Sequence, residues 1–171
     1  MLMKVDKDIE ALVWPVSDLE YRNLEQLLLQ NGCGKRIPVW QGFVIGDFVS
    51  YLICLTHHIP FQTEEINLNT WEDVLIYVCR NQLNRKDIPG NMRKYLIGKR
   101  YLAEKIITAK NLADSRRNPL YPANGPIHTP SGGVQFRTST RLEREYLVCG
   151  TTVEQYGYHV LDRTLMLCVS S

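Results

Sequence analysis

Residues 38–88 constrain the fold of this chain more than any other segment, because strand-type and helix-type patterns alternate there at short intervals. The first part of the pattern consists of two short apolar runs, residues 37–40 and 43–45, which are separated by Gln41-Gly42. A two-residue connection of this kind is typical of a β-hairpin. The sequence therefore predicts two antiparallel strands at this point.

A helix, a strand and a second helix are expected after the hairpin. Residues 48–57 favour a helix, which ends before Pro60 because proline cannot continue it. Residues 61–68 alternate in part and predict a strand. Thr70 begins a capping-box pattern for a helix over residues 71–83. This order of elements predicts a small α/β domain.

The segment before the hairpin is expected to hold a further strand and helix. Residues 9–16 are largely apolar and predict a first strand, with Trp14 in the core. Ser17 caps a helix over residues 18–30, because its hydroxyl offers an acceptor to the first amides. Leucines at helical spacing predict the buried face of this helix: Leu19, Leu24, Leu27 and Leu28.

The second half of the chain is predicted to be helical on either side of an irregular connection. Residues 91–112 have a helical pattern with an apolar stripe, which is expected to pack in a core. Residues 113–136 hold four of the eight prolines and predict a linker. Two helices over residues 139–146 and 151–167, the second capped by Thr151, have the outline of a helix-turn-helix.

Charge is distributed unevenly behind a formal net charge of +2. Residues 1–79 carry five Lys/Arg and eleven Asp/Glu, whereas residues 80–117 carry eleven and three, and the remainder is balanced. A segment this basic is a candidate surface for a polyanion. The alternative is a solvated helix face that pairs with the acidic N-terminal part of the same chain or of another.

The five cysteines are far apart in sequence and form no C-x-x-C pair. They are therefore expected to be reduced and mostly buried. A reactive cysteine needs an electropositive surrounding. Cys33, which lies close to Lys35 and Arg36, is the candidate of that kind.

Neither a metal site nor acid–base catalysis is expected from the other polar residues. His57 and His58 are neighbours at a helix end and do not share a face, and two adjacent glutamates, Glu64 and Glu65, point to opposite faces of a strand. No run of eighteen apolar residues predicts a membrane helix, and the first residues lack a signal-peptide pattern. We therefore expect a cytoplasmic protein without a metal or a cofactor.

Three pieces of sequence carry a resemblance to a known family: N-G-C-G-K-R-I-P-V-W over residues 31–40, G-D-F-V-S-Y over 46–51, and N-Q-L-N-R-K-D-I over 81–88. They resemble the ParB-like N-terminal domain, whose fold is shared with sulfiredoxin and occurs in plasmid, phage and chromosomal DNA-handling proteins. Members from mobile elements often continue to a helix-turn-helix, and T-S-T-R-L-E-R-E-Y-L-V-C over residues 138–149 is similar to its start.

The same resemblance implies a nucleotide pocket that has lost much of its chemistry. An arginine in the family's turn meets a triphosphate or a DNA phosphate, but Ser50 stands at that position and the usual Asp-Gly order is reversed to Gly46-Asp47. A hydroxyl cannot replace the fork of donors that a guanidinium provides. Asn81 stands where the family has an acidic residue, whereas Arg85 remains as a phosphate contact. The residues expected at this degenerate pocket are Lys35, Arg36, Gly46, Asp47, Ser50, Asn81 and Arg85.

Enzymatic activity is not expected from such a pocket, because CTP hydrolysis and nuclease chemistry need the missing groups. Sulfiredoxin-type activity needs a cysteine in the turn, and residues 46–50 contain none. The fold class expected is α+β. Its parts are a ParB/sulfiredoxin-like α/β domain over residues 1–88, a basic helix over 89–112, a linker over 113–136 and a helix-turn-helix-like domain over 137–171.

The function expected from the sequence is non-catalytic DNA binding, as a ParB-like accessory or regulatory protein in plasmid partition or transcription regulation. Duplex DNA is the expected partner, with a homodimer as a second one and no membrane. Basic residues would hold phosphates, and the start of the last helix would read bases. The residues are Arg85, Lys86, Arg93, Lys94 and Arg100 for phosphates, and Thr151, Thr152, Gln155 and Tyr156 for bases.

Two alternatives stay open at this point. The degenerate turn could serve a protein partner or a homodimer instead of a nucleotide, with Phe48 and Val49 exposed or half-exposed at the contact. Arg85 and the backbone amides of residues 32–36 could also still hold a nucleotide, as in a CTP-binding ParB-like switch.

Overall fold

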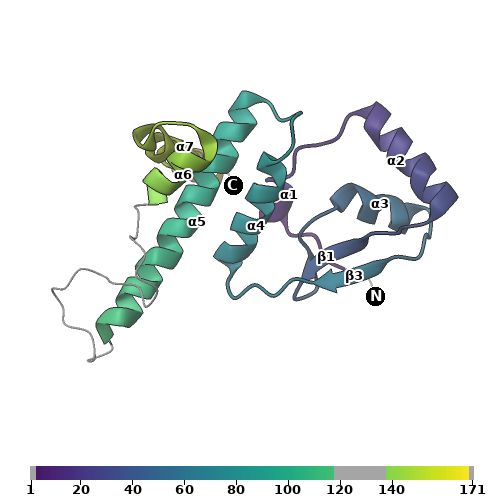
Figure 1. Ribbon diagram of the computed structural model, residues 1–171, viewed down its shortest axis with the longest axis horizontal. Coiled ribbons are helices and arrows are strands. Elements are labelled where there is room, and N and C mark those ends of the chain that lie inside the picture. The colour runs from purple at the N-terminus through teal and green to yellow at the C-terminus, as the bar shows by residue number, and fades with distance from the viewer. Residues whose placement is uncertain (1–2, 118–137, 170–171) are drawn as a thin grey trace. The chain divides into compact units, whose positions relative to one another are not determined.

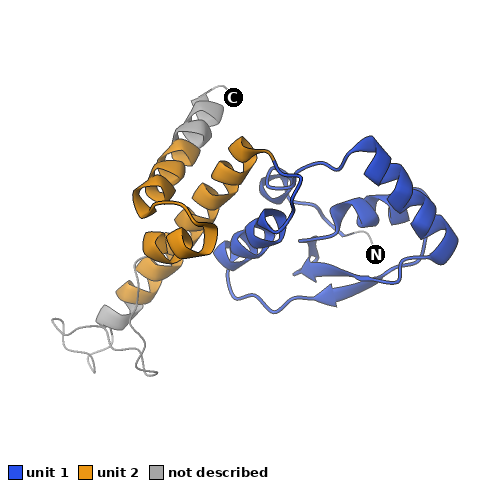
Figure 2. Ribbon diagram, turned by 45° about the horizontal axis from the view of Figure 1, so that its top comes forward, with its two compact units in different colours: residues 1–88 blue, residues 89–171 orange. Residues whose placement is uncertain are grey.

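The structure is a computed structural model that describes residues 3–117 and 138–169, with side chains over residues 3–113 and 138–161. Within these ranges the chain forms seven helices and one three-stranded sheet, so the predicted mixed α+β class is confirmed (Figure 1). The chain divides into two compact units, residues 1–88 and 89–171 (Figure 2). Each unit is described by itself below.

The sheet of the first unit contains the predicted hairpin. Strand β1 (Arg36–Trp40) lies in the middle, antiparallel to β2 (Phe43–Val44) and parallel to β3 (Gln62–Glu65). Gln41 and Gly42 join β1 to β2 with φ angles of 48° and 84°. Positive φ at both central residues is the geometry that tight hairpins favour, because its twist matches that of the strands.

The strand β3 forms an edge of the sheet, and all four of its side chains are exposed. Charged side chains on an edge discourage pairing with another chain. Of the two glutamates, Glu65 accepts a hydrogen bond from the backbone N–H of Gln41 through Oε1 at 2.7 Å. Glu65 therefore stabilises the hairpin turn.

Four helices surround this sheet: α1 (Lys7–Glu10), α2 (Asp18–Asn31), α3 (Phe48–Thr56) and α4 (Trp71–Leu83). The predicted helices α2, α3 and α4 are confirmed. The predicted caps also form, because the Ser17 and Thr70 hydroxyls each accept from the backbone N–H three residues on, and the acidic side chain there accepts in return. Such reciprocal bonds satisfy amides that have no partner inside the helix.

The core of the first unit is made by apolar side chains from strands and helices together. Two aromatic residues close it with hydrogen bonds to backbone carbonyls: the Trp40 indole donates to Leu68 O at 2.9 Å, and the Tyr51 hydroxyl donates to Met3 O at 2.8 Å. The fully buried aliphatic residues include Ile9, Leu12, Ile37, Val44, Ile45, Ile53, Val74 and Val78.

Two predictions about the N-terminal segment are wrong. Residues 9–16 form no strand: Asp6 caps the short helix α1, and the following residues are irregular, with Trp14 only half-buried. The apolar pattern there buries Ile9 and Leu12, which are three residues apart, as a helical turn does. On α2, Leu28 is buried, but a predicted core residue, Leu19, is 69% exposed, and Leu27 is 54% exposed.

The second unit consists of α5 (Gly90–Arg117), α6 (Thr138–Tyr146) and α7 (Gly150–Val169), and α5 packs against both of the others. The basic helix therefore shares one unit with the C-terminal pair, instead of standing apart from it. Helix α5 also continues beyond the predicted end at residue 112, and the rest of the predicted linker, residues 118–136, lies outside the described residues. Among the described helices, none combines the length and apolar content that crossing a bilayer requires.

Helix α7 begins one residue earlier than the sequence suggests. The carbonyl of Cys149 accepts from the N–H groups of Thr152 and Val153 at 2.9 and 3.1 Å, so Cys149 stands at the capping position that was expected for Thr151. Helices α6 and α7 are thus joined by the short turn at residues 147–149, and Leu147 in that turn is 92% exposed.

Glycines allow α5 and α7 to cross at close range. A Cβ atom placed on Gly98 would lie 2.7 Å from the carbonyl carbon of Tyr156 and 2.9 Å from Cγ2 of Val160. A Cβ atom on Gly157 would lie 2.7 Å from Cδ1 of Tyr101. Real side chains do not approach so closely, so both positions need glycine for packing and not for backbone conformation.

Candidate functional site

A cavity of about 410 Å³ lies at the N-terminal end of α3 in the first unit. It is lined by residues of the turn before α3, by the last turns of α4 and by the segment before α2. Five of the seven residues predicted at a degenerate nucleotide pocket lie in this lining, namely Gly46, Asp47, Ser50, Asn81 and Arg85. The other two, Lys35 and Arg36, are exposed and lie outside the lining.

The turn that leads into α3 is shaped by two residues. A Cβ atom on Gly46 would lie 2.7 Å from Cγ of Pro38, so glycine lets the turn pack on β1. Asp47 has φ 48° and ψ 39°, a left-handed conformation that aspartate tolerates better than most residues, and its side chain makes no capping bond to α3. The exposed carboxylate of Asp47 places negative charge where a phosphate would approach the helix, and this weakens anion binding.

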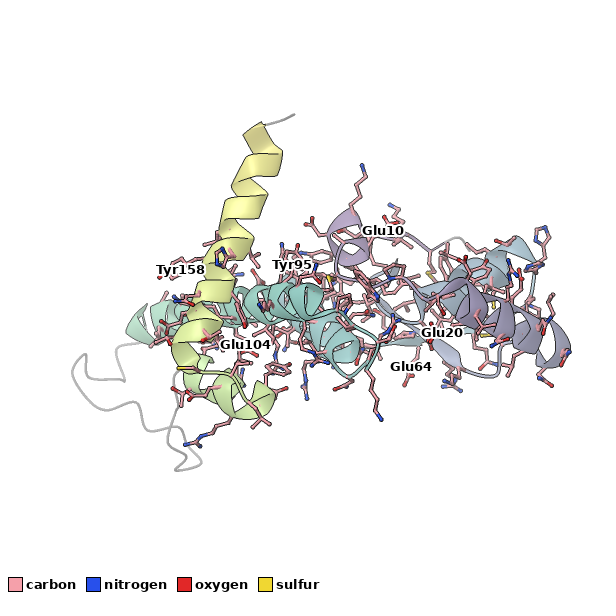
Figure 3. All side chains as sticks on the ribbon, turned by 90° about the horizontal axis from the view of Figure 1, so that it is seen from above. Glu10, Glu20, Glu64, Tyr95, Glu104 and Tyr158 are labelled. Atoms are coloured by element: carbon pink, nitrogen blue, oxygen red, sulfur yellow. The ribbon has the colours of Figure 1, made fainter. Side chains whose placement is uncertain are left out.

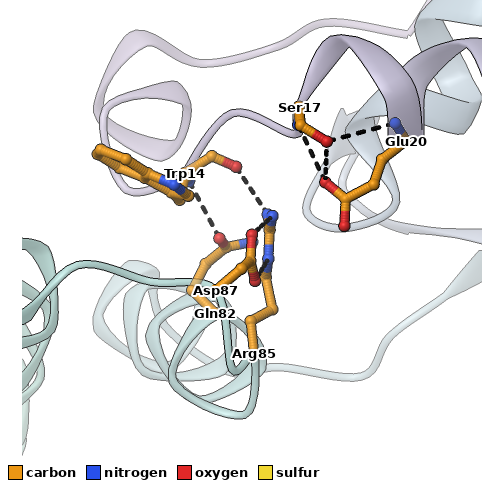
Figure 4. Close-up of polar contacts among 6 residues, drawn as sticks. All are labelled: Trp14, Ser17, Glu20, Gln82, Arg85 and Asp87. Carbon is orange, nitrogen blue, oxygen red and sulfur yellow. Dashed lines mark hydrogen bonds and ion pairs between the residues drawn. The ribbon is translucent and has the colours of Figure 1, made fainter.

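The guanidinium of Arg85 is engaged within the first unit (Figure 4). Its Nε and Nη2 donate to the two carboxylate oxygens of Asp87 at 3.0 and 2.5 Å, and Nη1 donates to Trp14 O at 2.7 Å. The backbone N–H of Trp14 in turn donates to Oε1 of Gln82 at 3.0 Å. Arg85 therefore ties the segment before α2 to the end of α4, and Asp87 offsets the charge that was expected to hold a phosphate.

The pKa of Asp87 agrees with the hydrogen bonds that it accepts from Arg85. Hydrogen bonds from Arg85 lower the pKa of Asp87 from its ordinary value of 3.8, so the carboxylate stays ionised at neutral pH. The Ser17 cap likewise lowers the pKa of Glu20 by hydrogen bonding (Figure 4). An ionised Asp87 holds Arg85 in place and offsets the positive charge that Arg85 brings to the cavity lining.

The walls of the cavity are mostly apolar. Phe48 is buried, which corrects the expectation that it is exposed or half-exposed for a partner, whereas Val49 is half-exposed. Cavities of this size with apolar walls and a few polar groups are typical of small-molecule sites. The apolar lining residues are Val13, Val16, Leu24, Pro38, Ile45, Phe48, Val49, Tyr77 and Val78.

The basic helix α5 does not expose all of its cations. Arg100 is 4% exposed, and it donates to Glu104 through Nε at 2.9 Å and to Glu145 through both terminal nitrogens. Nη1 also reaches the Tyr146 hydroxyl, and Arg141 pairs with Glu104. This finding corrects the expectation that Arg100 contacts DNA phosphates, because its own acidic neighbours surround it.

Other cations of α5 stay accessible. Lys94 is exposed, as is the preceding predicted residue Lys86 of the first unit, whereas Arg93 is half-buried. Three further lysines of α5 were not selected in the sequence analysis: Lys99, which is half-buried, and Lys105 and Lys110, which are exposed. The ammonium groups of Lys99 and Lys105 lie 5.8 and 5.4 Å from the ring centroids of Tyr95 and Tyr101.

One face of α7 is polar and exposed. Two of the residues expected to read bases, Thr151 and Gln155, lie on it, and Tyr158 extends it by another turn with 66% of its surface exposed (Figure 3). The other two predicted residues, Thr152 and Tyr156, are half-buried. The spacing of Thr151, Gln155 and Tyr158, at four and then three residues, could have pointed to Tyr158, because such positions share a helix face.

Histidines and acids form no metal site in the described part of the chain, where no group of three or more His, Cys, Asp or Glu side chains could hold an ion. His57 Nε2 lies 2.7 Å from Oε1 of Glu25 and so links α3 to α2. His58 Nδ1 lies 3.1 Å from Leu55 O at the end of α3. Both histidines thus have local structural partners.

Comparison with known proteins identifies the fold. No family model matches the chain, and no curated protein matches it. Among solved structures it is similar to a Pnob8-like ParB-N domain, with 12% identity and a TM-score of 0.58 over 96% of this chain and 68% of that one. At this identity the likeness shows the fold alone. The chain therefore has a ParB-like N-terminal fold, which confirms that part of the sequence resemblance.

Proposed function

We propose that this chain is a non-catalytic DNA-binding protein of ParB-like type, with an accessory or regulatory role on a plasmid or another mobile element. The observation that carries the proposal is the exposed polar face of α7, which follows α6 after a short turn and stands on the same compact unit as the lysines of α5. Helix α7 would lie in the major groove, as the second helix of a helix-turn-helix does.

Phosphate contacts would come from lysines instead of Arg100. Lys94 and Lys105 are eleven residues apart, which is three helical turns, so they lie on one side of α5. Lys99 and Lys110 have the same separation on another side. Each pair spans about 16 Å along the helix axis, which is enough to reach successive phosphates.

Base contacts would come from the polar face of α7. The amide of Gln155 can both donate to and accept from the edge of an adenine in the major groove. Thr151, at the first turn of the helix, suits a phosphate oxygen, and the phenol of Tyr158 can donate to phosphate or pack on the sugar. The face carries no cation among its described residues, so we expect modest sequence preference on top of lysine-driven affinity.

Fluorescence anisotropy of a labelled duplex, titrated at several KCl concentrations, tests the proposal. We expect binding at low salt, with an affinity that falls steeply as salt rises. The double variant Lys94→Gln/Lys105→Gln should reduce the slope of log affinity against log salt by about 2. Lys35→Gln, in the first unit, is the matched control and should leave the slope unchanged. Absence of binding to any duplex at low salt would refute the proposal.

The cavity beside α3 favours a second candidate function, the binding of a small ligand. The observation in its favour is that five residues expected at a nucleotide site line one cavity, namely Gly46, Asp47, Ser50, Asn81 and Arg85. The carboxylate of Asp47, the pairing of Arg85 with Asp87 and the apolar walls all disfavour a triphosphate there. A thermal-shift screen with CTP and other nucleotides, with and without magnesium, tests this point. A large stabilisation by CTP would support a ParB-like switch. If CTP does not stabilise the protein, the remaining candidates for this cavity are ligands that carry little charge.

A further inference from the structure

Two cysteines that are far apart in sequence lie next to each other in the first unit. Cys54 of α3 is 1% exposed and belongs to a core cluster with Leu28 and Ile53. Cys33, which follows α2, is half-buried and packs against the same cluster. Burial and a hydrogen bond with Cys33 raise the pKa of the Cys54 thiol to about 11, so Cys54 is protonated at neutral pH.

The loop that carries Cys33 is rich in glycine. Cys33 stands between Gly32 and Gly34, and a Cβ atom built on either glycine would meet no atom within 4 Å. The Cys33 thiol donates to Lys35 O at 3.3 Å, which is a weak local bond. A disulfide requires the sulfurs to approach to about 2.05 Å. Because glycine has wide backbone freedom, the loop at Cys33 can adjust to bring the two sulfurs together, whereas Cys54 lies within the helix α3.

We infer that Cys33 and Cys54 are a redox pair that closes into an intramolecular disulfide when the protein meets a hydroperoxide. The thiolate of Cys33, the more accessible of the two, attacks the outer oxygen of the hydroperoxide, and the O–O bond breaks. Cys33 becomes a sulfenic acid and the peroxide leaves as an alcohol or water. Cys54 then attacks the Cys33 sulfur, its proton leaves with the hydroxyl as water, and the S–S bond forms. Two thiols are oxidised by two electrons and one hydroperoxide is reduced.

The bond would join the segment after α2 to the last turn of α3. Leu24 of α2 and Val49 of α3 both line the cavity beside α3, so the disulfide would fix two of its walls relative to each other. This inference does not depend on DNA binding, since both cysteines belong to the first unit and the proposed DNA contacts belong to the second. It assigns a modification site to Cys33, which lies close to Lys35 and Arg36 in the sequence, and it names Cys54 as the second thiol.

A competing thiol must be removed before the test. Cys149 is exposed, and hydrogen bonds from Thr151 lower the pKa of its thiol, so it would consume peroxide. The double variant Cys149→Ser/Cys168→Ser leaves Cys33, Cys54 and the buried Cys79. This variant is the parent protein for the experiment.

The parent is treated with a small excess of hydrogen peroxide, alkylated without reduction, digested and analysed by mass spectrometry. We expect one cross-linked peptide pair that contains Cys33 and Cys54, lighter than the reduced pair by about 2 Da because two hydrogens are lost. The pair should disappear on adding dithiothreitol. The oxidised protein should also melt roughly 5–10 °C higher than the reduced one, because the bond constrains the unfolded chain.

Two variants make the result decisive. Cys33→Ser leaves the core intact and should abolish both the cross-link and the rise in melting temperature. Cys54→Ala keeps an apolar side chain in the cluster, and it should leave Cys33 as a sulfenic acid that dimedone traps. Alkylation of Cys33 and Cys54 as free thiols after oxidation, a bond from Cys33 to Cys79, or cross-linking only between two chains would each overturn the inference.

Discussion

Arg100 of α5 donates through both of its terminal nitrogens to the carboxylate of Glu145 of α6, with Nη1–Oε1 and Nη2–Oε2 distances of 2.5 and 2.8 Å. A second carboxylate, that of Glu104, accepts from Nε on the same guanidinium. Arg100, which the sequence places in a basic surface, is therefore part of an internal network of ion pairs. Its evident role is to hold α6 on α5, and through the short turn to set where α7 begins.

Removing this guanidinium should destabilise the second unit. Arg100→Ala leaves Glu104, which is 6% exposed, without its Nε partner, and breaking a buried pair by removing one side costs about 3–5 kcal/mol. Because Glu145 is 37% exposed and can be solvated, we expect a value at the lower end, about 3 kcal/mol. Urea unfolding followed by circular dichroism measures it. The exposed Lys105→Ala should change stability by less than about 0.5 kcal/mol, and equal effects of the two variants would argue against the network.

Gly98→Ala should destabilise the protein although alanine favours helices. In an exposed helix the exchange gains about 1 kcal/mol. At Gly98, however, the new methyl group would collide with the backbone of Tyr156 and with Val160, which forces α5 and α7 apart. Overpacking of this kind costs about 1–3 kcal/mol or more. Gly90→Ala, where a Cβ atom meets nothing within 4 Å, is the control and should be neutral or stabilising in the same thermal melts.

Acid should weaken the first unit through Asp87. Because hydrogen bonds from Arg85 lower the pKa of Asp87 in the folded state, this group stabilises the fold above its ordinary pKa of 3.8. That contribution is lost as pH falls below 3.8 toward the folded value. Asp87→Asn should therefore be less stable than the wild type at pH 6, and the difference should shrink in melts at pH 3. A constant difference from pH 6 to pH 3 would show that the ionised pair is not responsible.

Alkali should weaken the second unit through Tyr146. Burial raises the pKa of Tyr146 from 10.0 to about 12, so the fold keeps the phenol protonated while the unfolded chain releases its proton. The contribution is complete below pH 10 and is lost as pH rises from about 10 to about 12. Tyr146→Phe removes this titration, and its stability relative to the wild type should rise across that window. Cys54 titrates in both proteins, so it cancels from the comparison.

Local chemistry made part of the fold predictable. Ser17 and Thr70 were predicted as helix caps, with a capping box at Thr70, and both cap their helices; Ser17 forms a capping box as well. Gln41-Gly42 allows the positive φ angles of a tight turn, and the hairpin forms there. These signals act between residues close in sequence, so the sequence contains them in full.

The wrong predictions concern residues whose structure depends on long-range packing. The run at residues 9–16 is as apolar as a strand, but the sheet finds its third strand in residues 62–65, and the N-terminal run contributes Ile9 and Leu12 to the core from a helical turn. Leu19 and Leu27 have helical spacing, yet the packing of α2 buries Leu28. A hydrophobic pattern shows that a helix or strand has an apolar face. The elements that pack against that face determine which of its residues are buried.

The sequence by itself determined the caps, the hairpin, the helical second half and the positive charge of the middle segment, because each depends on the chain's own residues within a few positions. Only the tertiary structure decided that Arg100 pairs with Glu104 and Glu145, and that Arg85 donates hydrogen bonds to Asp87 and Trp14. It also decided that Cys33 packs beside Cys54. The physical reason is that burial and pairing decide what a charge or a thiol can do. Burial and pairing depend on which distant segments the fold brings together.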